Sequence, residues 1–270
     1  MARTSHERLR VAAVAGLPAL LAGAWFSWSL SAAPVTAAEE RAPTDLAELL
    51  ERVREEHGVP ALGGAIVTTE GVHALGAAGK RVRGGDEPVT RDDLWHIGSC
   101  TKAVTATLLG RLHDSGDLAL DTPLATALPG LAESMDARWR GVPLLRLLQN
   151  RAGVPGEIEP GLWRPLWNPD LAPTDARARL AAHVLGAAPA HEPGTRYVYS
   201  NAGFAIAGHA AERRLGLAWE QLVRERVFAP LGMTRSGFGA PGGGAGRDQP
   251  WGHRAVGGEL VPVPPGPAAD

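Results

Sequence analysis

A single cysteine, Cys100, limits how this chain of 270 residues can be stabilised. One thiol cannot form a disulfide within the chain, so the folded state has to depend on an apolar core. Hydrophobic residues make up 44% of the sequence, which is enough for such a core in one large domain or two small ones. The formal net charge of −2 gives no electrostatic reason to expect a nucleic-acid partner.

The N-terminus is typical of an export signal. Three arginines lie within the first ten residues, an apolar stretch follows from about Val11 to Leu30, and Val35-Thr36-Ala37 fits a signal-peptidase site. We therefore predict a signal peptide over residues 1–37, a periplasmic or extracellular mature protein, and no stable membrane span after cleavage. The alternative is an uncleaved N-terminal anchor, because about 20 apolar residues can cross a bilayer.

Hydrophobic spacing predicts a helix and a hairpin at the start of the mature chain. Apolar residues recur at the helical period, so we expect a helix that has Thr44 as its N-cap and ends near His57. Ala61–Thr69 is expected to form a buried strand, and Val72–Gly79 is expected to be its hairpin partner.

The middle of the chain is predicted to be largely helical. Helices are expected over Ser99–Ser115, Asp175–Leu185, Ala202–Leu215 and Ala218–Phe228, with short helical pieces near Leu124 and Leu144. The residues after 240 are mostly glycine, proline and polar residues, with one weak strand at Glu259–Val263. A few strands around a helical middle indicate an α+β fold, arranged as two lobes.

The first motif with chemical meaning is Ser99-Cys100-Thr101-Lys102, at the start of a predicted helix. Ser99 and Lys102 are three residues apart and therefore share a helical face. A serine hydroxyl is a poor nucleophile until a base takes its proton, and a lysine amine can be that base if burial disfavours its charged form. Arginine cannot, so it is informative that one of only two lysines in the chain stands here. Alone, the pattern also fits a capping serine followed by a solvated lysine.

The second motif is Tyr199-Ser200-Asn201. A tyrosine near a serine and a lysine can relay protons, and the Asn201 amide can orient Lys102 and bind a substrate carbonyl. The alternative is a polar turn in which Asn201 only caps the following helix.

Together and in this order, the two motifs resemble the serine β-lactamase-like family of class C β-lactamases, DD-peptidases and family VIII esterases. The segment Leu94–Lys102 is similar to the nucleophile region of that family, and Tyr199-Ser200-Asn201 to its Tyr-x-Asn motif. The segment Pro230–Thr234 resembles a shared stretch near the end of the helical lobe.

A further segment, Leu147–Val154, is similar to the family's Leu-Leu-x-His-x-Ser-Gly stretch. Gln149, Asn150 and Ala152 depart from its commonest form.

The resemblance implies a fold with an antiparallel sheet lobe, flanked by helices from both chain ends, and an all-α lobe over about residues 99–240. The active site would lie between the lobes. It also implies that Ser99 is the nucleophile, Lys102 the base, Tyr199 a proton relay and Asn201 a substrate-binding residue. The expected substrate is a small-molecule or peptidoglycan-like amide, β-lactam or ester, and no metal or organic cofactor is expected.

The family's third motif, usually Lys-Thr-Gly or His-x-Gly on a strand, has no clear counterpart. Arg235-Ser236-Gly237 is superficially similar, but its position directly after the Leu-Gly-Met-Thr segment predicts a turn. The resemblance then implies that the hydrolase domain, residues 38–270, is incomplete at its C-terminus, without the last strands, the closing helix and half of the oxyanion hole. The strand at Ala61–Thr69 is expected to lack a neighbour.

Loss of one oxyanion donor costs about 10²–10³ in rate, so impaired turnover is expected. The alternative is a non-catalytic binding or sensor protein, or an inactive fragment, that keeps a penicillin-binding-like cleft.

Other reactive residue types give weaker indications. Cys100 points about 100° around the helix from Ser99, so we interpret it as a buried structural thiol. The nine histidines show no metal-ligand spacing, and no metal site is predicted.

Processing of the N-terminus can be tested directly. We expect cleavage after about Ala37, because the basic, apolar and small-residue segments follow one another in the order of a signal peptide. N-terminal sequencing of the exported protein checks this. A mature protein that begins at Met1 would show that the segment is an anchor.

Overall fold

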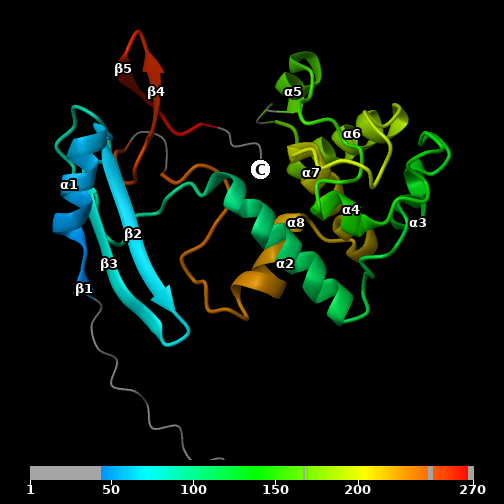
Figure 1. The fold of residues 1–270 in the computed structure, drawn as a ribbon, viewed down its shortest axis with the longest axis horizontal. Helices are drawn as coiled ribbons and strands as arrows, with labels where there is room; N and C mark the ends of the chain where they lie inside the picture. The colour runs from blue at the N-terminus through cyan, green and yellow to red at the C-terminus, as the bar shows by residue number, and fades with distance from the viewer. Residues whose placement is uncertain (1–43, 167, 169, 243–245, 267–270) are drawn as a thin grey trace, which may run out of the picture. The chain divides into compact units, whose positions relative to one another are not determined.

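The structure, a computed structural model, describes residues 44–166, 168, 170–242 and 246–266 (Figure 1). These residues belong to one compact unit that starts at Pro43. The predicted signal peptide and its cleavage site lie outside the described residues. Within the described ranges, no helix is both long and apolar enough to span a bilayer.

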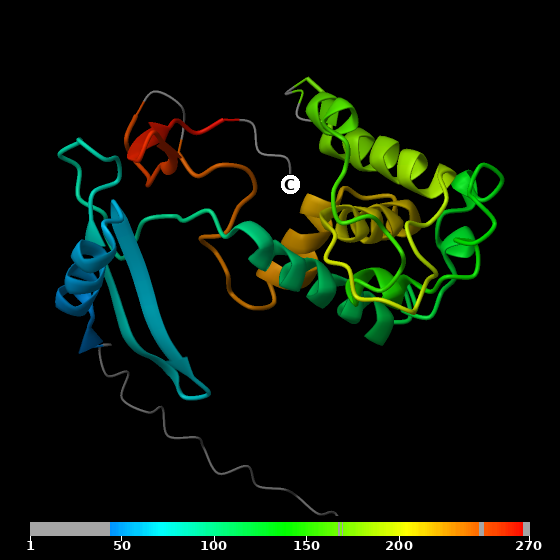
Figure 2. The ribbon, with the colours of Figure 1, turned by 45° about the horizontal axis from the view of Figure 1, so that its top comes forward.

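A small sheet and one helix form the N-terminal part of the unit. The elements are β1 (Thr44–Asp45), α1 (Ala47–His57), β2 (Ala61–Thr68) and β3 (Gly71–Gly79). β2 and β3 form the predicted antiparallel hairpin, and β1 pairs in parallel with β3, which gives the order β1-β3-β2. α1 packs on these strands (Figure 2). Gly76 permits the close approach, because a Cβ there would lie 2.8 Å from the Ala47 nitrogen.

The predicted start of α1 is wrong. Thr44 does not cap the helix, since Thr44 and Asp45 pair with Ala74 and Leu75 of β3 instead. The side chain that serves the helix start is Asp45, whose Oδ1 accepts the Ala47 N–H at 2.8 Å. Strand pairing, which helical periodicity does not show, therefore moved the helix start by a few residues.

β2 lies at an edge of this sheet, as expected from the sequence. Its apolar residues Ile66 and Val67 are 53% and 65% exposed, so the strand is not the buried strand that was predicted. The strand carries no proline or charged residue of the kind that usually protects an edge.

The helices occupy the middle of the chain. They are η1 (Gly98–Cys100), α2 (Thr101–Asp114), α3 (Leu124–Ala127), η2 (Pro129–Leu131), α4 (Leu144–Leu148), α5 (Pro160–Leu166), α6 (Pro173–Gly186), α7 (Asn201–Leu215), α8 (Trp219–Val223) and the π-helical turn η3 (Arg224–Phe228). α7 contacts α2, α4, α6 and α8 (Figure 1). Most of its buried positions are alanine or glycine, and the others are Ile206, His209 and Glu212. Small residues let the neighbouring helices approach closely: a Cβ at Gly208 would lie 3.1 Å from the Trp219 ring. α5 was not predicted from the sequence.

A second hairpin, β4 (Gly252–Val256) and β5 (Glu259–Val263), lies near the C-terminus. Only its second strand was predicted. Gly257 and Gly258 connect the strands with φ values of 61° and 89°, which suits the two-residue turns that glycine pairs form. The hairpin is fixed to the segment after β3, because the Arg83 N–H donates to His253 Nε2 at 3.0 Å.

A buried ionic cluster joins α6, α7 and α8. Arg177 and Glu212, 5% and 6% exposed, are paired at 2.7 Å, and Arg177 also contacts Glu220 at 2.9 Å. Glu212 further interacts with His209 at 3.2 Å and accepts the Trp219 N–H at 2.9 Å. Burial would raise the pKa of Glu212, but the bonds from His209 and Arg177 outweigh it and bring the pKa to about 2.

Removal of Arg177 should therefore be costly. We expect Arg177→Ala to lower the free energy of unfolding by about 3–5 kcal/mol, because Glu212 would be left buried without its charge partner. Arg179→Ala is the matched control, since Arg179 is exposed on the same helix. Urea denaturation measures both, and an equal, small loss in the two variants would contradict a structural role for the cluster.

Candidate active site

The first site residue, Ser99, lies in the 3-10 turn η1 that leads into α2. Gly98, directly before it, has φ 51°, in the left-handed region that favours glycine. The turn is closed by a hydrogen bond from the Cys100 N–H to the Ile97 carbonyl at 3.1 Å. Gly98 was not predicted as a site residue from the sequence, although a glycine directly before the nucleophile can indicate a left-handed backbone conformation.

The four residues predicted for the site meet in space. The Tyr199 hydroxyl donates to Ser99 Oγ at 2.6 Å, and Lys102 Nζ donates to the same oxygen at 3.1 Å. Lys102 Nζ also donates to Asn201 Oδ1 at 2.5 Å. α2 supplies the lysine and the start of α7 supplies the asparagine, so the contact between these helices assembles the site.

Lys102 lies between two aromatic rings. Its Nζ atom is 4.5 Å from the ring centroid of Tyr199 and 5.7 Å from that of Phe204, both within the range of cation–π attraction. Phe204 was not identified from the sequence. The Lys102 contact, with a smaller contribution from Ser99, lowers the pKa of the Tyr199 phenol.

Two neighbouring residues at the start of α7 have different roles: Ser200 caps the helix, and Asn201 contacts Lys102. Ser200, 2% exposed, is the N-cap: its Oγ accepts the Gly203 N–H at 3.3 Å and donates to the Pro155 carbonyl at 2.7 Å. The alternative in which Asn201 merely caps the helix is therefore wrong, because Ser200 takes that role. The Asn201 side chain reaches Lys102 instead.

Two other sequence interpretations can be compared with the structure. Cys100 is exposed, so its interpretation as a buried thiol is wrong. The residue lies in the short turn before α2, where core packing has not yet begun. Arg235 lies in a turn, as predicted for Arg235-Ser236-Gly237, and Ser236 and Gly237 follow it without helix or strand. Arg235 pairs with Asp92 at 3.1 Å. Across the described residues, no cluster of histidine, cysteine and carboxylate side chains could hold a metal ion.

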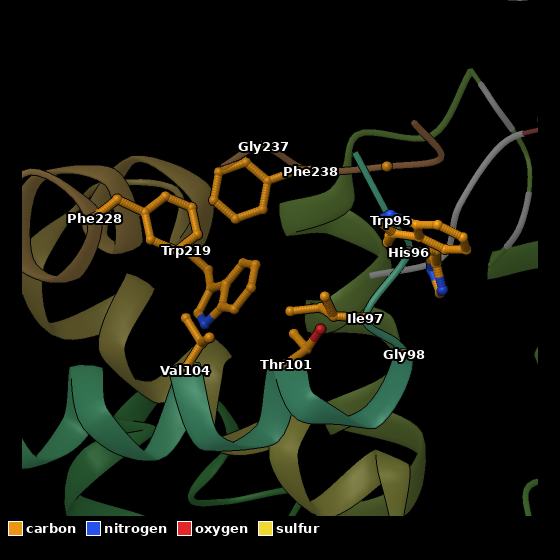
Figure 3. A pocket seen from close by; sticks show the side chains of 11 residues that line it. Trp95, His96, Ile97, Gly98, Thr101, Val104, Trp219, Phe228, Gly237 and Phe238 are labelled. Carbon is orange, nitrogen blue, oxygen red and sulfur yellow. The ribbon is translucent and has the colours of Figure 1, made fainter. Parts of the chain in front are cut away.

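A shallow hollow adjoins the nucleophile turn (Figure 3). Its lining includes Trp95, Ile97, Val104, Trp219, Phe228 and Phe238. Thr101 also faces it and, two residues beyond Ser99, points about 200° around the helix from that serine. The hollow and the site are therefore both lined by residues of the turn around Ser99, but the hollow lies on a different side from the contacts among Ser99, Lys102 and Tyr199.

A serine at a helix start, with a lysine one turn later and a tyrosine on its hydroxyl, defines the chain as a candidate serine acyl-transfer protein. Its sequence matches the model of the Beta-lactamase family over residues 46–270. The chain belongs to this family, which supports a serine hydrolase of this fold.

Individual relatives agree with the assignment. "Penicillin-binding protein 4" of Amycolatopsis lactamdurans is 34% identical over 189 residues, which cover 70% of this chain and 47% of the relative. A "Beta-lactamase" of Escherichia coli (strain K12) is 31% identical over 180 residues, 67% of this chain and 43% of the relative. A solved class C beta-lactamase has a TM-score of 0.64 at 23% identity, over 80% of this chain and 55% of that chain.

These similarities confirm the predicted α+β, β-lactamase-like fold. The chain spans less than half the length of the curated relatives it matches.

The electrostatics of the site can be measured through Tyr199. The chain has only two tyrosines, so in a Tyr197→Phe background the tyrosinate absorbance reports Tyr199 alone. We expect its pKa to lie below the ordinary value of about 10, and Lys102→Met to raise it. Lys80→Met, at the other lysine, is the control and should leave the titration unchanged. An unchanged pKa in Lys102→Met would contradict the contact.

Proposed function

We propose that this chain is a serine hydrolase in which Ser99 forms an acyl-enzyme with an amide, β-lactam or ester substrate. The observation that carries the proposal is the position of Ser99 Oγ, 2.6 Å from the Tyr199 hydroxyl and 3.1 Å from Lys102 Nζ. Such neighbours are what a serine nucleophile needs, since its hydroxyl reacts poorly until the proton is removed.

The contacts favour Tyr199 as the immediate proton acceptor. Its phenol is the closer group, and the neighbouring Lys102 lowers its pKa, which increases the phenolate fraction. Lys102, held by Asn201, stabilises that phenolate by its charge. In this scheme Lys102 acts through Tyr199, whereas the sequence alone suggested that Lys102 is the base and Tyr199 the relay.

The reaction then follows from the geometry. As Ser99 Oγ bonds to the substrate carbonyl carbon, its proton moves to Tyr199, which delivers it to the leaving nitrogen or oxygen when that bond breaks. The Ser99 N–H, at the start of a helix, is positioned to stabilise the oxyanion. Asn201 uses Oδ1 for Lys102, so its amide NH₂ is the group that faces the substrate in this scheme.

The names of the relatives, a penicillin-binding protein and a beta-lactamase, support a β-lactam-like small molecule as substrate. The basic and apolar N-terminal segment of the sequence supports an exported location. Substrate, turnover and location of the whole protein remain part of the proposal, because the chain matches less than half of those relatives.

A second candidate is a binding protein that acylates without efficient turnover. It is favoured by the exposure of Ser99 and Tyr199, since water weakens the electrostatic stabilisation of a transition state.

Covalent labelling tests the nucleophile. We expect a fluorophosphonate or a labelled penicillin to modify Ser99, and Ser99→Ala to abolish the modification. Lys102→Arg should reduce the labelling rate by about 10²-fold or more, because arginine keeps a positive charge but its planar guanidinium cannot reproduce the contacts of the amine with Ser99 Oγ and Asn201 Oδ1.

Cys100→Ala is the control for the exposed neighbouring thiol and should label as the wild type does. Peptide mapping by mass spectrometry locates the adduct. Labelling of Ser99→Ala at the wild-type rate would refute the assignment.

A further inference from the structure

One residue outside the catalytic motifs, Asn150, has an unusual backbone. Its φ is 54°, and among the described residues it is the only non-glycine residue with a positive φ. Asparagine tolerates this left-handed conformation better than most residues, but it remains uncommon away from glycine. Strained backbones of this kind are informative when the surrounding contacts show what the conformation achieves.

The conformation turns two acceptors of Asn150 towards one segment of chain. Its backbone carbonyl accepts the Val198 N–H at 2.8 Å, and its side-chain Oδ1 accepts the Ser200 N–H at 3.0 Å. Val198 and Ser200 are the residues on either side of Tyr199. A single residue therefore fixes the backbone both before and after the tyrosine.

The position of Tyr199 depends on these two hydrogen bonds, because its side chain is not held by packing. Its side chain is 44% exposed, and the segment between α6 and α7 has no helix or strand. Further bonds of this segment run to the loop that follows Asn150: the Gly194 N–H donates to the Arg151 carbonyl at 2.7 Å, and Ser200 Oγ donates to the Pro155 carbonyl at 2.7 Å.

Asn150 itself is anchored to the core. Its N–H donates to the Leu147 carbonyl at 3.0 Å, and the next N–H, of Arg151, donates to the Arg146 carbonyl at 2.9 Å, so the residue continues the end of α4. Leu144 and Leu147 of that helix are buried in the core. The line of contacts thus runs from the core through Asn150 to the tyrosine backbone.

We infer that Asn150 is a positioning residue that fixes Tyr199 against Ser99 by holding the backbone on both sides of the tyrosine. This inference rests on the proposed function for its catalytic meaning, but its structural content can be measured separately. Asn150 contacts neither Ser99 nor Lys102 through any described hydrogen bond, so it acts only through Tyr199.

Asn150→Gly isolates the side-chain acceptor. Glycine permits the left-handed φ and keeps the carbonyl that binds Val198, and it removes the side chain together with its acceptor Oδ1. In the Tyr197→Phe background we expect the pKa of Tyr199 to rise towards its ordinary value, because the phenol moves away from Lys102. The rate of Ser99 labelling should fall by about 10- to 100-fold, the range that small misplacements of a catalytic group produce.

Two further variants keep the test decisive. Asn150→Asp retains an oxygen acceptor in the same place, so Ser99 should be labelled near the wild-type rate. This variant is compared by labelling alone, because the negative charge of the aspartate would itself raise the pKa of Tyr199. Gln149→Ala removes the neighbouring exposed amide, which bonds only to Arg146, and should change neither readout. Circular dichroism and thermal melts establish that each variant is folded.

The outcomes separate the two proposals. A folded Asn150→Gly with wild-type Tyr199 titration overturns the positioning role, and so does a folded Asn150→Asp that loses labelling as fully as the glycine variant. If the wild-type chain is not labelled at Ser99, the proposed function fails, while the Tyr199 titration of Asn150→Gly still decides whether Asn150 positions the tyrosine.

Discussion

The packing of α7 against its neighbouring helices is the interaction on which the rest of the structure depends. With a single cysteine there is no disulfide within the chain, and the alanine and glycine residues of α7 let α2, α4, α6 and α8 approach closely. α2 carries Lys102, with Ser99 in the turn before it, and α7 begins at Asn201. The contact between these two helices therefore brings together residues that are about a hundred positions apart in the chain.

Arg177 and Lys102, two positively charged residues of the helical part, have different surroundings. Arg177 is buried, but it is paired with two carboxylates, so its charge stabilises the packing of α6 on α7 and α8. Within the part of the chain that the structure describes, Lys102 hydrogen-bonds to a hydroxyl and an amide oxygen and to no carboxylate, and its Nζ atom also lies near two aromatic rings. The Lys102 ammonium group therefore interacts with the neighbouring Tyr199 side chain, favours its phenolate form and so lowers its pKa.

Local patterns in the sequence predicted the hairpin and the main helices, because periodicity depends on neighbouring residues. The residues that meet at the site were predicted from the resemblance of two separate motifs to a family. The errors have a different origin. Thr44 pairs with a distant strand instead of capping α1. The strand β2 was predicted to be buried, but the exposure of Ile66 and Val67 depends on which elements lie beside that strand. Asn150 was visible only as a departure from a family pattern, since its role depends on contacts with a segment some fifty residues away.

Two irregular segments lead into the helices that carry the site, and each is fixed to the rest of the chain at a few points. The segment before Ser99 is held by the Trp95 ring, which lies against Gly63 of β2 so closely that a Cβ there would be 3.2 Å from it, and by the Leu94 N–H, which donates to Gln249 at 2.5 Å. The segment before Asn201 is held by Asn150. Neither is part of a helix or strand, so the distance between Ser99 and Tyr199 depends on both sets of anchors together. A change at either anchor can thus alter the chemistry without touching a reacting atom.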